Sequence, residues 1–127
     1  MPEFELKTIL HASVIVSDTQ RSLAFYHGIL GLPVSPDRPD LGYPGAWLCL
    51  GDQQLHLLEL PNPDPVSGRP DHGGRDRHVA IGVCNLDMLQ QRLDEQGLHY
   101  TRSKSGRAAL FVRDPDSNTL ELIELQS

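Results

Sequence analysis

GDQQLHLLEL, residues 51–60, returns without a gap as DSNTLELIEL, residues 116–125. HASVIVSD, residues 11–18, corresponds in the same order to HVAIGVCN, residues 78–85. The chain therefore contains an internal repeat, and we interpret residues 1–127 as one domain built from two related modules. The predicted parts are module one at about residues 7–60, a linker at 61–77 and module two at 78–127.

Length and composition limit what kind of protein this is. The 127 residues, 39% hydrophobic and 22% charged, suffice for one compact core. A net charge of -6 argues against a partner that is nucleic acid or an anionic membrane, because phosphate binding depends on Lys and Arg. We find no secretory leader and no apolar run approaching the roughly 20 residues of a membrane span. We therefore expect a cytoplasmic protein that binds a small molecule or a second copy of itself.

The hydrophobic pattern predicts the same order of elements in both modules. Module one reads as a strand over Ile9–Val16, a helix that Asp18 caps and that ends near Leu30, and two strands joined by a turn at Gly51-Asp52. The strands of that pair are predicted at 46–50 and 54–60. In module two the pattern predicts a strand at 78–84, a helix at 86–97 behind Asn85, and strands at 98–102, 108–113 and 118–125. This is an α+β fold.

The linker over residues 61–77 holds four prolines and three glycines, which exclude a helix or a central strand. Two interpretations stay open, a solvated connector and a loop that covers a site or reaches a neighbouring subunit. We expect His27, His72 and His99 to face solvent. Cys49 and Cys84 lie in apolar runs, so we expect them to be small buried residues without a disulfide.

Four side chains that can bind metal occupy matching places in the repeat. His11 corresponds to His78, and His56 corresponds to Glu121. Side chains alternate along a strand, so Glu121 and Glu124 should face opposite ways, with Glu59 also outside the site. If equivalent strands lie side by side in one curved sheet, the four groups can converge.

Three imidazoles and one carboxylate suit a divalent transition metal. A lone histidine in a strand is more often an ordinary core or edge residue. The repeat favours a shared site for His11, His78 and Glu121, whereas His56 is an optional fourth ligand because metal sites often keep an open position.

Basic residues gather around the last predicted hairpin, at Arg102, Lys104, Arg107 and Arg113. Such a group is commonly a solvated strand edge, where Lys and Arg deter pairing with other strands. The alternative is a clamp for an anionic substrate, since guanidinium groups match carboxylate oxygens. The first interpretation is slightly favoured.

Nearly the whole chain resembles the vicinal oxygen chelate superfamily, which includes glyoxalase I, fosfomycin thiol transferases, extradiol ring-cleaving dioxygenases and bleomycin-resistance proteins. The resemblance rests on LHASVIVSDTQRSLAFYHGILGL at 10–32, RHVAIGV at 77–83 and FVRDPDSNTLELIEL at 111–125. In the last motif Ser117 replaces the usual glycine of the family. The resemblance implies two tandem βαβββ modules forming a cup-shaped curved mixed sheet with helices outside, around a metal ion, commonly in a homodimer.

Matched residue by residue, the family's metal ligands correspond to His11, His78 and Glu121, with His56 at the fourth position. Subfamilies differ at that position, and bacterial glyoxalase I has glutamate there. The resemblance implies one divalent ion per site, which could be Fe, Ni, Co, Zn or Mn. His56 leaves one carboxylate where glyoxalase I has two.

The first expectation for function is a glyoxalase-I-like (lactoylglutathione lyase type) isomerisation of a thiol adduct of a 2-oxoaldehyde, with Glu121 moving the proton. The closest alternative is a ring-cleaving dioxygenase using His11, His78 and Glu121 on Fe(II), with His56 as an acid or base. Further alternatives are a fosfomycin-type thiol transferase and a non-catalytic, bleomycin-resistance-like binder. A binder has no need of three imidazoles facing a carboxylate. The expected substrate is a small molecule, anionic or thiol-conjugated.

Overall fold

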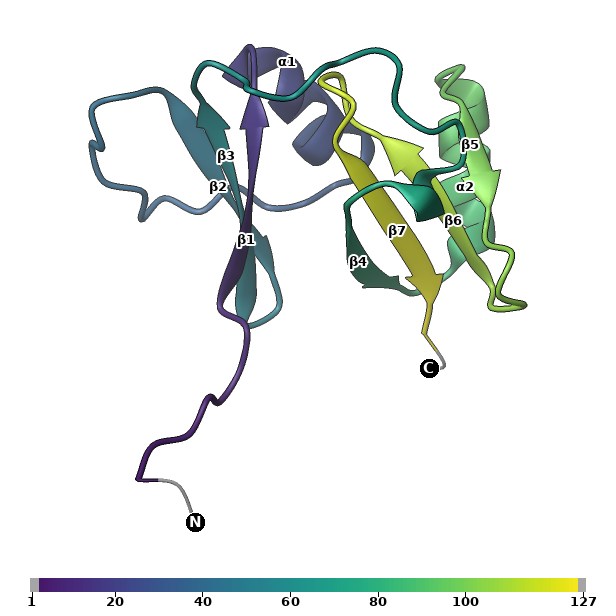
Figure 1. The fold of residues 1–127 in the computed structure, drawn as a ribbon, viewed down its shortest axis with the longest axis horizontal. Helices are drawn as coiled ribbons and strands as arrows, with labels where there is room; N and C mark the ends of the chain where they lie inside the picture. Colours follow the sequence, from purple (N-terminus) through teal and green to yellow (C-terminus); the bar gives the residue numbers. More distant parts are fainter. Residues whose placement is uncertain (1–2, 126–127) are drawn as a thin grey trace.

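The first of two mixed β-sheets belongs to module one. In the computed structural model, which describes residues 3–125, β1 (His11–Val16) pairs in parallel with β3 (Gln53–Glu59). On its other side β3 pairs antiparallel with β2 (Gly45–Leu50), so the strand order is β1-β3-β2 (Figure 1). The turn at Gly51-Asp52 joins β2 to β3 as predicted.

The second sheet belongs to module two and repeats this plan. There β4 (His78–Val83) pairs in parallel with β7 (Thr119–Glu124), and β7 pairs antiparallel with β6 (Ala109–Arg113). The short strand β5 (Tyr100–Arg102) completes the order β4-β7-β6-β5. The α+β fold with mixed strand directions is confirmed, with two separate sheets in place of one continuous sheet.

The repeat is visible in the strand register. His11 is opposite Gln54 on β3, so His56 lies two residues further along. His78 is opposite Thr119 on β7, so Glu121 lies two residues further along. The two candidate ligands of each module are therefore diagonal neighbours on one sheet face, in the same geometry.

Each sheet carries a helix that begins directly after its first strand. In module one α1 (Thr19–Leu23) runs into a π-helical segment, η1 (Ala24–Ile29), and in module two α2 spans Leu86–Glu95. Asp18 accepts a hydrogen bond from the Arg21 N–H and Asn85 accepts one from the Met88 N–H, so both predicted caps are confirmed.

The last glutamate of each module's final strand reinforces the helix start. Glu59 Oε1 accepts a hydrogen bond from the Thr19 N–H at 2.7 Å, and Glu124 Oε2 accepts one from the Leu86 N–H at 3.1 Å. A carboxylate is favourable there because the first helical N–H groups lack partners and the helix dipole is positive. Glu59 and Glu124 thus serve the helices, on the face opposite His56 and Glu121.

Module one has one strand fewer than module two. The segment before β2 forms only an isolated bridge, between Val34 and Leu48. Pro33 and Pro36 flank Val34, and proline cannot donate a ladder hydrogen bond. The fourth strand implied by the family resemblance is therefore reduced to one bridge, in agreement with the two-strand meander that the hydrophobic pattern predicts.

A single core joins the modules. Its buried apolar side chains come from both sheets and from the helices: Val16, Phe25, Tyr26, Ala46, Leu48, Leu55, Leu57, Leu86, Leu93, Leu110, Val112, Leu120 and Leu122. Hydrogen bonds also cross between the modules, among them one from Tyr26 Oη to Asp114 Oδ2 at 2.7 Å and one from Asn118 Nδ2 to the Ile15 carbonyl at 2.9 Å. Because the core is shared, the relative position of the two sheets is set by packing.

The linker packs on module two. Its short 3₁₀ turn, η2 (Gly73–Arg75), contacts β6 and β7. A Cβ at Gly73 would lie 2.7 Å from Thr119 Cγ2 and 2.8 Å from Phe111 Cβ, so only glycine permits this approach. The prediction that His72 faces solvent is wrong, because the ring is half-buried and its Nδ1 lies 2.9 Å from Thr101 Oγ1.

Ser117 adopts a φ of +67°, the left-handed conformation that favours the glycine usual in the family. The replacement therefore keeps the turn, and the Ser117 hydroxyl donates to the Val66 carbonyl of the linker at 2.8 Å. The Cys84 residue is exposed, contrary to expectation, because it follows the end of β4, whereas Cys49 is half-buried and both thiols are free.

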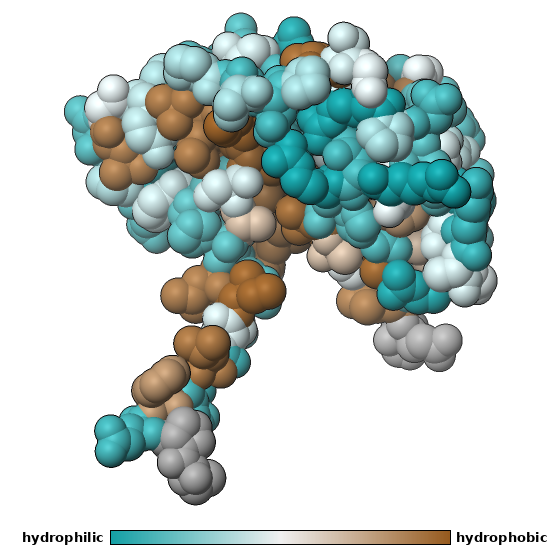
Figure 2. Space-filling view, viewed as in Figure 1, coloured by the Kyte–Doolittle hydropathy of each residue, from teal (hydrophilic) through white to brown (hydrophobic). Residues whose placement is uncertain are grey.

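An extended N-terminal segment projects from the body (Figure 1). Its large apolar side chains are unusually exposed, Phe4 by 74%, Leu6 by 94%, Ile9 by 68% and Leu10 by 69%. Figure 2 shows this segment as a largely hydrophobic projection. No helix within residues 3–125 is long and apolar enough to cross a lipid bilayer.

Candidate functional site

The first pair of candidate ligands, His11 and His56, stacks face to face. Their ring centroids lie 3.9 Å apart with an interplanar angle of 14°. Trp47, opposite His56 on β2, stacks on the other face of His56 with centroids 4.3 Å apart. His56 is only 8% exposed, so the pair presents His11 outward and holds His56 between two rings.

The surroundings of His56 favour its neutral form. Burial lowers the pKa of His56, and the positive charge that His11 and Arg38 can carry lowers it further. Neutral imidazole is the form that binds a metal ion. His56 Nε2 lies 2.8 Å from Gln54 Oε1, so one ring nitrogen already has a partner.

The second pair, His78 and Glu121, brings an imidazole to a buried carboxylate. His78 Nε2 lies 3.4 Å from Glu121 Oε1, and the Glu121 side chain is 4% exposed. Arg107 Nη2 donates to Glu121 Oε2 at 3.2 Å. A carboxylate is costly to bury without a positive partner, and the Arg107 guanidinium supplies one.

An aromatic side chain faces the second ligand in each module. Phe111 on β6 is opposite Glu121 and meets the His78 ring edge to face, with centroids 5.2 Å apart. This is the place that Trp47 takes opposite His56 in module one. The repeat did not reveal these two aromatics, because Trp47 lies nine residues before His56 whereas Phe111 lies ten residues before Glu121.

The four predicted ligands form two pairs and not one group. Within residues 3–125 no cluster of three or more His, Cys, Asp or Glu side chains is arranged to hold a metal ion. The condition for convergence, equivalent strands side by side in one sheet, is not met within this chain, because the pairs belong to separate sheets. β1 and β4 are outer strands of those sheets and neither pairs further in the described part of the chain.

The basic residues near the last hairpin do not form one clamp. Arg107 contacts Glu121, whereas Arg102 bonds to Gln90 on α2. Arg113 points into the linker, where it binds Asp76, and Lys104 is exposed. Only Arg107 lies at a candidate ligand.

Several hollows border the sheets, and two of them reach Ile81 and Gly82 of β4. One of about 700 Å³ is lined by His78 and Ala80 of β4 together with Ile9 and Gln54 of module one. It has the size of a small-molecule site and opens beside a candidate ligand.

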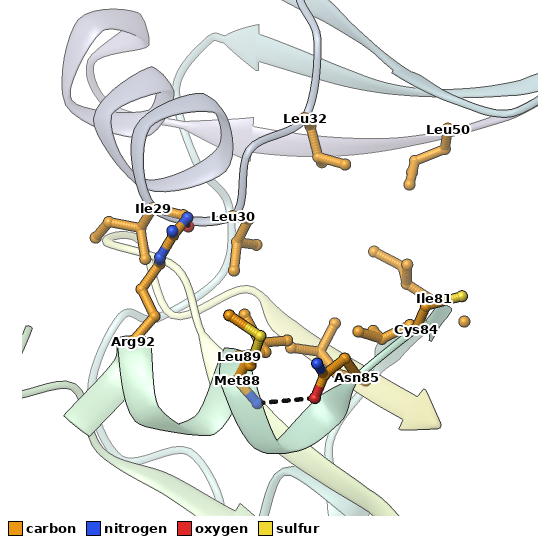
Figure 3. A pocket seen from close by; sticks show the side chains of 13 residues that line it. Ile29, Leu30, Leu32, Leu50, Ile81, Cys84, Asn85, Met88, Leu89 and Arg92 are labelled. Carbon is orange, nitrogen blue, oxygen red and sulfur yellow. Dashed lines mark hydrogen bonds between the residues drawn. The ribbon is translucent and has the colours of Figure 1, made fainter. Parts of the chain in front are cut away.

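The other hollow, of about 400 Å³, lies between the modules on the opposite face of β4 (Figure 3). Its walls are mainly apolar, including Leu30, Leu50, Ile81 and Leu89, with Arg92 at one side. None of the four candidate ligands lines it.

Comparison with known proteins adds a family and several relatives. A model described as "Glyoxalase/Bleomycin resistance protein/Dioxygenase superfamily" matches residues 8–122. The Bacillus subtilis protein YwkD is 36% identical over 126 residues, covering 94% of this chain and 98% of that protein. The lactoylglutathione lyase of Salmonella typhimurium is 32% identical over 124 residues, covering 91% of each. A crystal structure of a putative glyoxalase family protein from Bacillus anthracis superposes with a TM-score of 0.81 at 23% identity, covering 98% of this chain and 100% of the other.

Proposed function

Because the chain belongs to the glyoxalase, bleomycin resistance protein and dioxygenase superfamily, we propose that it is a metal-dependent enzyme that isomerises a thiol adduct of a 2-oxoaldehyde. One observation carries the proposal. Two donor pairs, His11 with His56 and His78 with Glu121, occupy the same register positions in two repeated sheets. A lactoylglutathione lyase aligned over 91% of the chain supports the choice of reaction.

The donor set fits a divalent transition ion. Three imidazoles and one carboxylate are ligands of Fe, Ni, Co, Zn and Mn. Burial keeps His56 in its neutral form, and the His78 Nδ1 atom bonds to the Asp76 carbonyl, as metal-bound histidines commonly do. The buried Glu121 carboxylate already accepts a hydrogen bond from the Arg107 guanidinium.

Different residues of the chain would have different roles in this reaction. When bound, the ion would act as a Lewis acid for oxyanion charge on the substrate. Glu121 would take the proton from the carbinol carbon of the hemithioacetal and return it to the neighbouring carbon, giving a 2-hydroxy thioester. Trp47 and Phe111 would exclude water from the two donor pairs.

We further propose that the complete site forms between two copies of the chain. Each copy would contribute His11 and His56 to one site and His78 and Glu121 to the other, which gives two equivalent sites in a symmetric dimer. Three observations support this: the pairs lie on separate sheets, no strand within residues 3–125 pairs with the outer edge of β1 or β4, and the N-terminal segment exposes apolar side chains.

The first experiment is turnover of methylglyoxal hemithioacetals of glutathione and of bacillithiol by protein loaded with Ni, Co or Zn. Formation of the 2-hydroxy thioester is expected, together with about one ion per chain. Absence of product with both thiols under every metal would rule out the proposed reaction.

Mixing two inactive variants tests the shared site. His11→Ala and Glu121→Gln are each expected to be inactive alone, because each damages both sites of its own dimer. After dissociation and reassociation in equal amounts, half of the dimers would hold one intact site, so about a quarter of wild-type activity should return. No recovery, with subunit exchange demonstrated by mass spectrometry, would place the whole site within one chain.

A ring-cleaving dioxygenase is the second candidate, and the contacts of His56 favour it. The Gln54 bond at His56 Nε2 and the rings on both sides would hold His56 away from an ion. His11, His78 and Glu121 then remain as the two-histidine, one-carboxylate set suited to Fe(II). Oxygen uptake with catechols by protein reconstituted with Fe(II) would support this candidate.

A further inference from the structure

A cluster of three charged side chains holds the end of the linker two residues before His78. Asp76 Oδ2 accepts one hydrogen bond from Arg69 Nε and one from Arg113 Nη1, both at 2.7 Å. The side chains of Asp76 and Arg69 are 11% and 10% exposed, and that of Arg113 is 25% exposed. We call these three residues the Asp76 cluster. No step of the proposed reaction uses it.

Arg113 connects this cluster to the strand that carries Glu121. Its Nη1 donates to Thr119 Oγ1 at 2.7 Å and to the Ser117 carbonyl at 2.8 Å, while its Nη2 donates to the Pro70 carbonyl at 2.6 Å. Thr119 is the residue opposite His78 in the β4–β7 ladder. The guanidinium therefore fixes Asp76 relative to the place where His78 meets β7.

The backbone of Asp76 in turn holds the His78 ring. His78 Nδ1 lies 2.8 Å from the Asp76 carbonyl oxygen. A carbonyl oxygen can only accept, so Nδ1 must carry the proton. In the neutral ring this leaves the lone pair on Nε2, the atom that faces Glu121 Oε1 at 3.4 Å. The competing tautomer would carry its proton on Nε2 and could donate it to Glu121.

We infer that Asp76, held by Arg69 and Arg113, is a positioning residue that sets the tautomer and orientation of His78. The linker then does more than connect the modules, because its last turn prepares one ring nitrogen as a ligand. The inference rests on the proposed function only where it makes His78 Nε2 a metal ligand. The tautomer itself exists in the metal-free protein and can be measured there.

The test uses metal-free full-length protein with ¹⁵N-labelled histidine, observed by long-range ¹H–¹⁵N NMR at a pH above the ordinary imidazole range. His78→Ala assigns the signals. The wild type is expected to show His78 protonated at Nδ1. In Arg113→Gln and in Asp76→Asn the signals should move toward the form protonated at Nε2.

Arg77→Gln is the matched control. Arg77 neighbours the same histidine, but its side chain is 72% exposed and its ion pair with Asp64 lies at the surface. Such a pair contributes little, so this variant should keep the wild-type tautomer. Metal affinity gives the second readout: loss of a group that orients a ligand commonly costs about 10 to 100-fold, which is expected for Arg113→Gln and not for Arg77→Gln.

The possible results separate the two proposals. An unchanged Nδ1–H signal in folded Arg113→Gln and Asp76→Asn would overturn the inference and leave the cluster as an anchor for the linker. If Arg113→Gln does not fold, Arg69→Gln replaces it in the test. That variant leaves Arg113 in place and is examined through the same His78 Nδ1–H signal. A third result would defeat the proposed function and support this inference. In it the wild-type protein binds no metal, and the Nδ1–H signal of His78 is lost in the variants.

Discussion

Tyr26 and Asp114 join the modules through one buried pair of side chains. The Tyr26 hydroxyl donates to Asp114 Oδ2 at 2.7 Å, and Tyr26 is fully buried. Tyr26→Phe removes the donor without leaving a cavity. Because hydrogen bonds to charged acceptors contribute about 1.5 to 3 kcal/mol, we expect a loss of about 2 kcal/mol in the free energy of unfolding. Urea denaturation measures it, with Tyr43→Phe as the control because that residue is only partly buried.

Asp114 should also give stability a specific pH dependence. Burial raises the pKa of Asp114 despite the hydrogen bonds from Asn118 and Tyr26 that lower it. The folded protein therefore keeps this proton at pH values where the unfolded chain has lost it. The stabilisation is complete below the unfolded pKa of about 3.9 and is lost as the pH rises through the folded value.

Asp114→Asn removes this titration while retaining the shape of the side chain. We expect the stability of the wild type relative to this variant to fall as the pH rises from about 4. Urea unfolding of both proteins across this range tests the prediction. A constant difference between the two would show that the folded carboxyl titrates at its ordinary value.

Among the elements, the η2 turn depends on a close approach to β6 and β7. Gly73→Ala would place a methyl group within 2.8 Å of Thr119 and Phe111 side-chain atoms. Overpacking of this kind costs about 1 to 3 kcal/mol and should displace η2 from the sheet. Thermal unfolding measures the loss. Gly28→Ala is the control, since its new Cβ would meet only the Leu23 carbonyl at 3.9 Å and should be tolerated.

Elements whose form depends on local residues were predictable from the sequence. Asp18 and Asn85 cap the helices, Gly51-Asp52 turns the chain, and side-chain alternation separates Glu121 from Glu124. Module one lacks a fourth strand because Pro33 and Pro36 interrupt the segment before β2, and the hydrophobic pattern accordingly predicts no strand there. Contacts between residues far apart in the chain have no local sequence pattern. Neither the burial of His72 against β6 nor the Asp76 cluster could therefore be predicted.

At the scale of the whole molecule, the repeat predicted which residues correspond but not how the two sheets sit. Register within each sheet follows from the pattern of apolar residues, and it places His11 beside His56 and His78 beside Glu121. The distance between the pairs depends on how the shared core packs, which no residue spacing encodes. The four candidate ligands therefore stay a prediction from the sequence, whereas their division into two pairs on separate sheets follows from how the chain packs.

A site shared between copies would make dimerisation depend on the metal ion. An ion bound by residues of two chains binds the dimer better than the monomer, so it must stabilise the dimer. We expect chelation to weaken dimerisation by about tenfold or more, the change that 1.4 kcal/mol produces. Sedimentation velocity over a range of protein concentrations measures the dissociation constant with and without metal. His11→Ala should dimerise equally weakly in both conditions, because its site cannot close around the ion. Equal dissociation constants for the loaded and metal-free wild type would mean that each ion belongs to one chain, whatever reaction it supports.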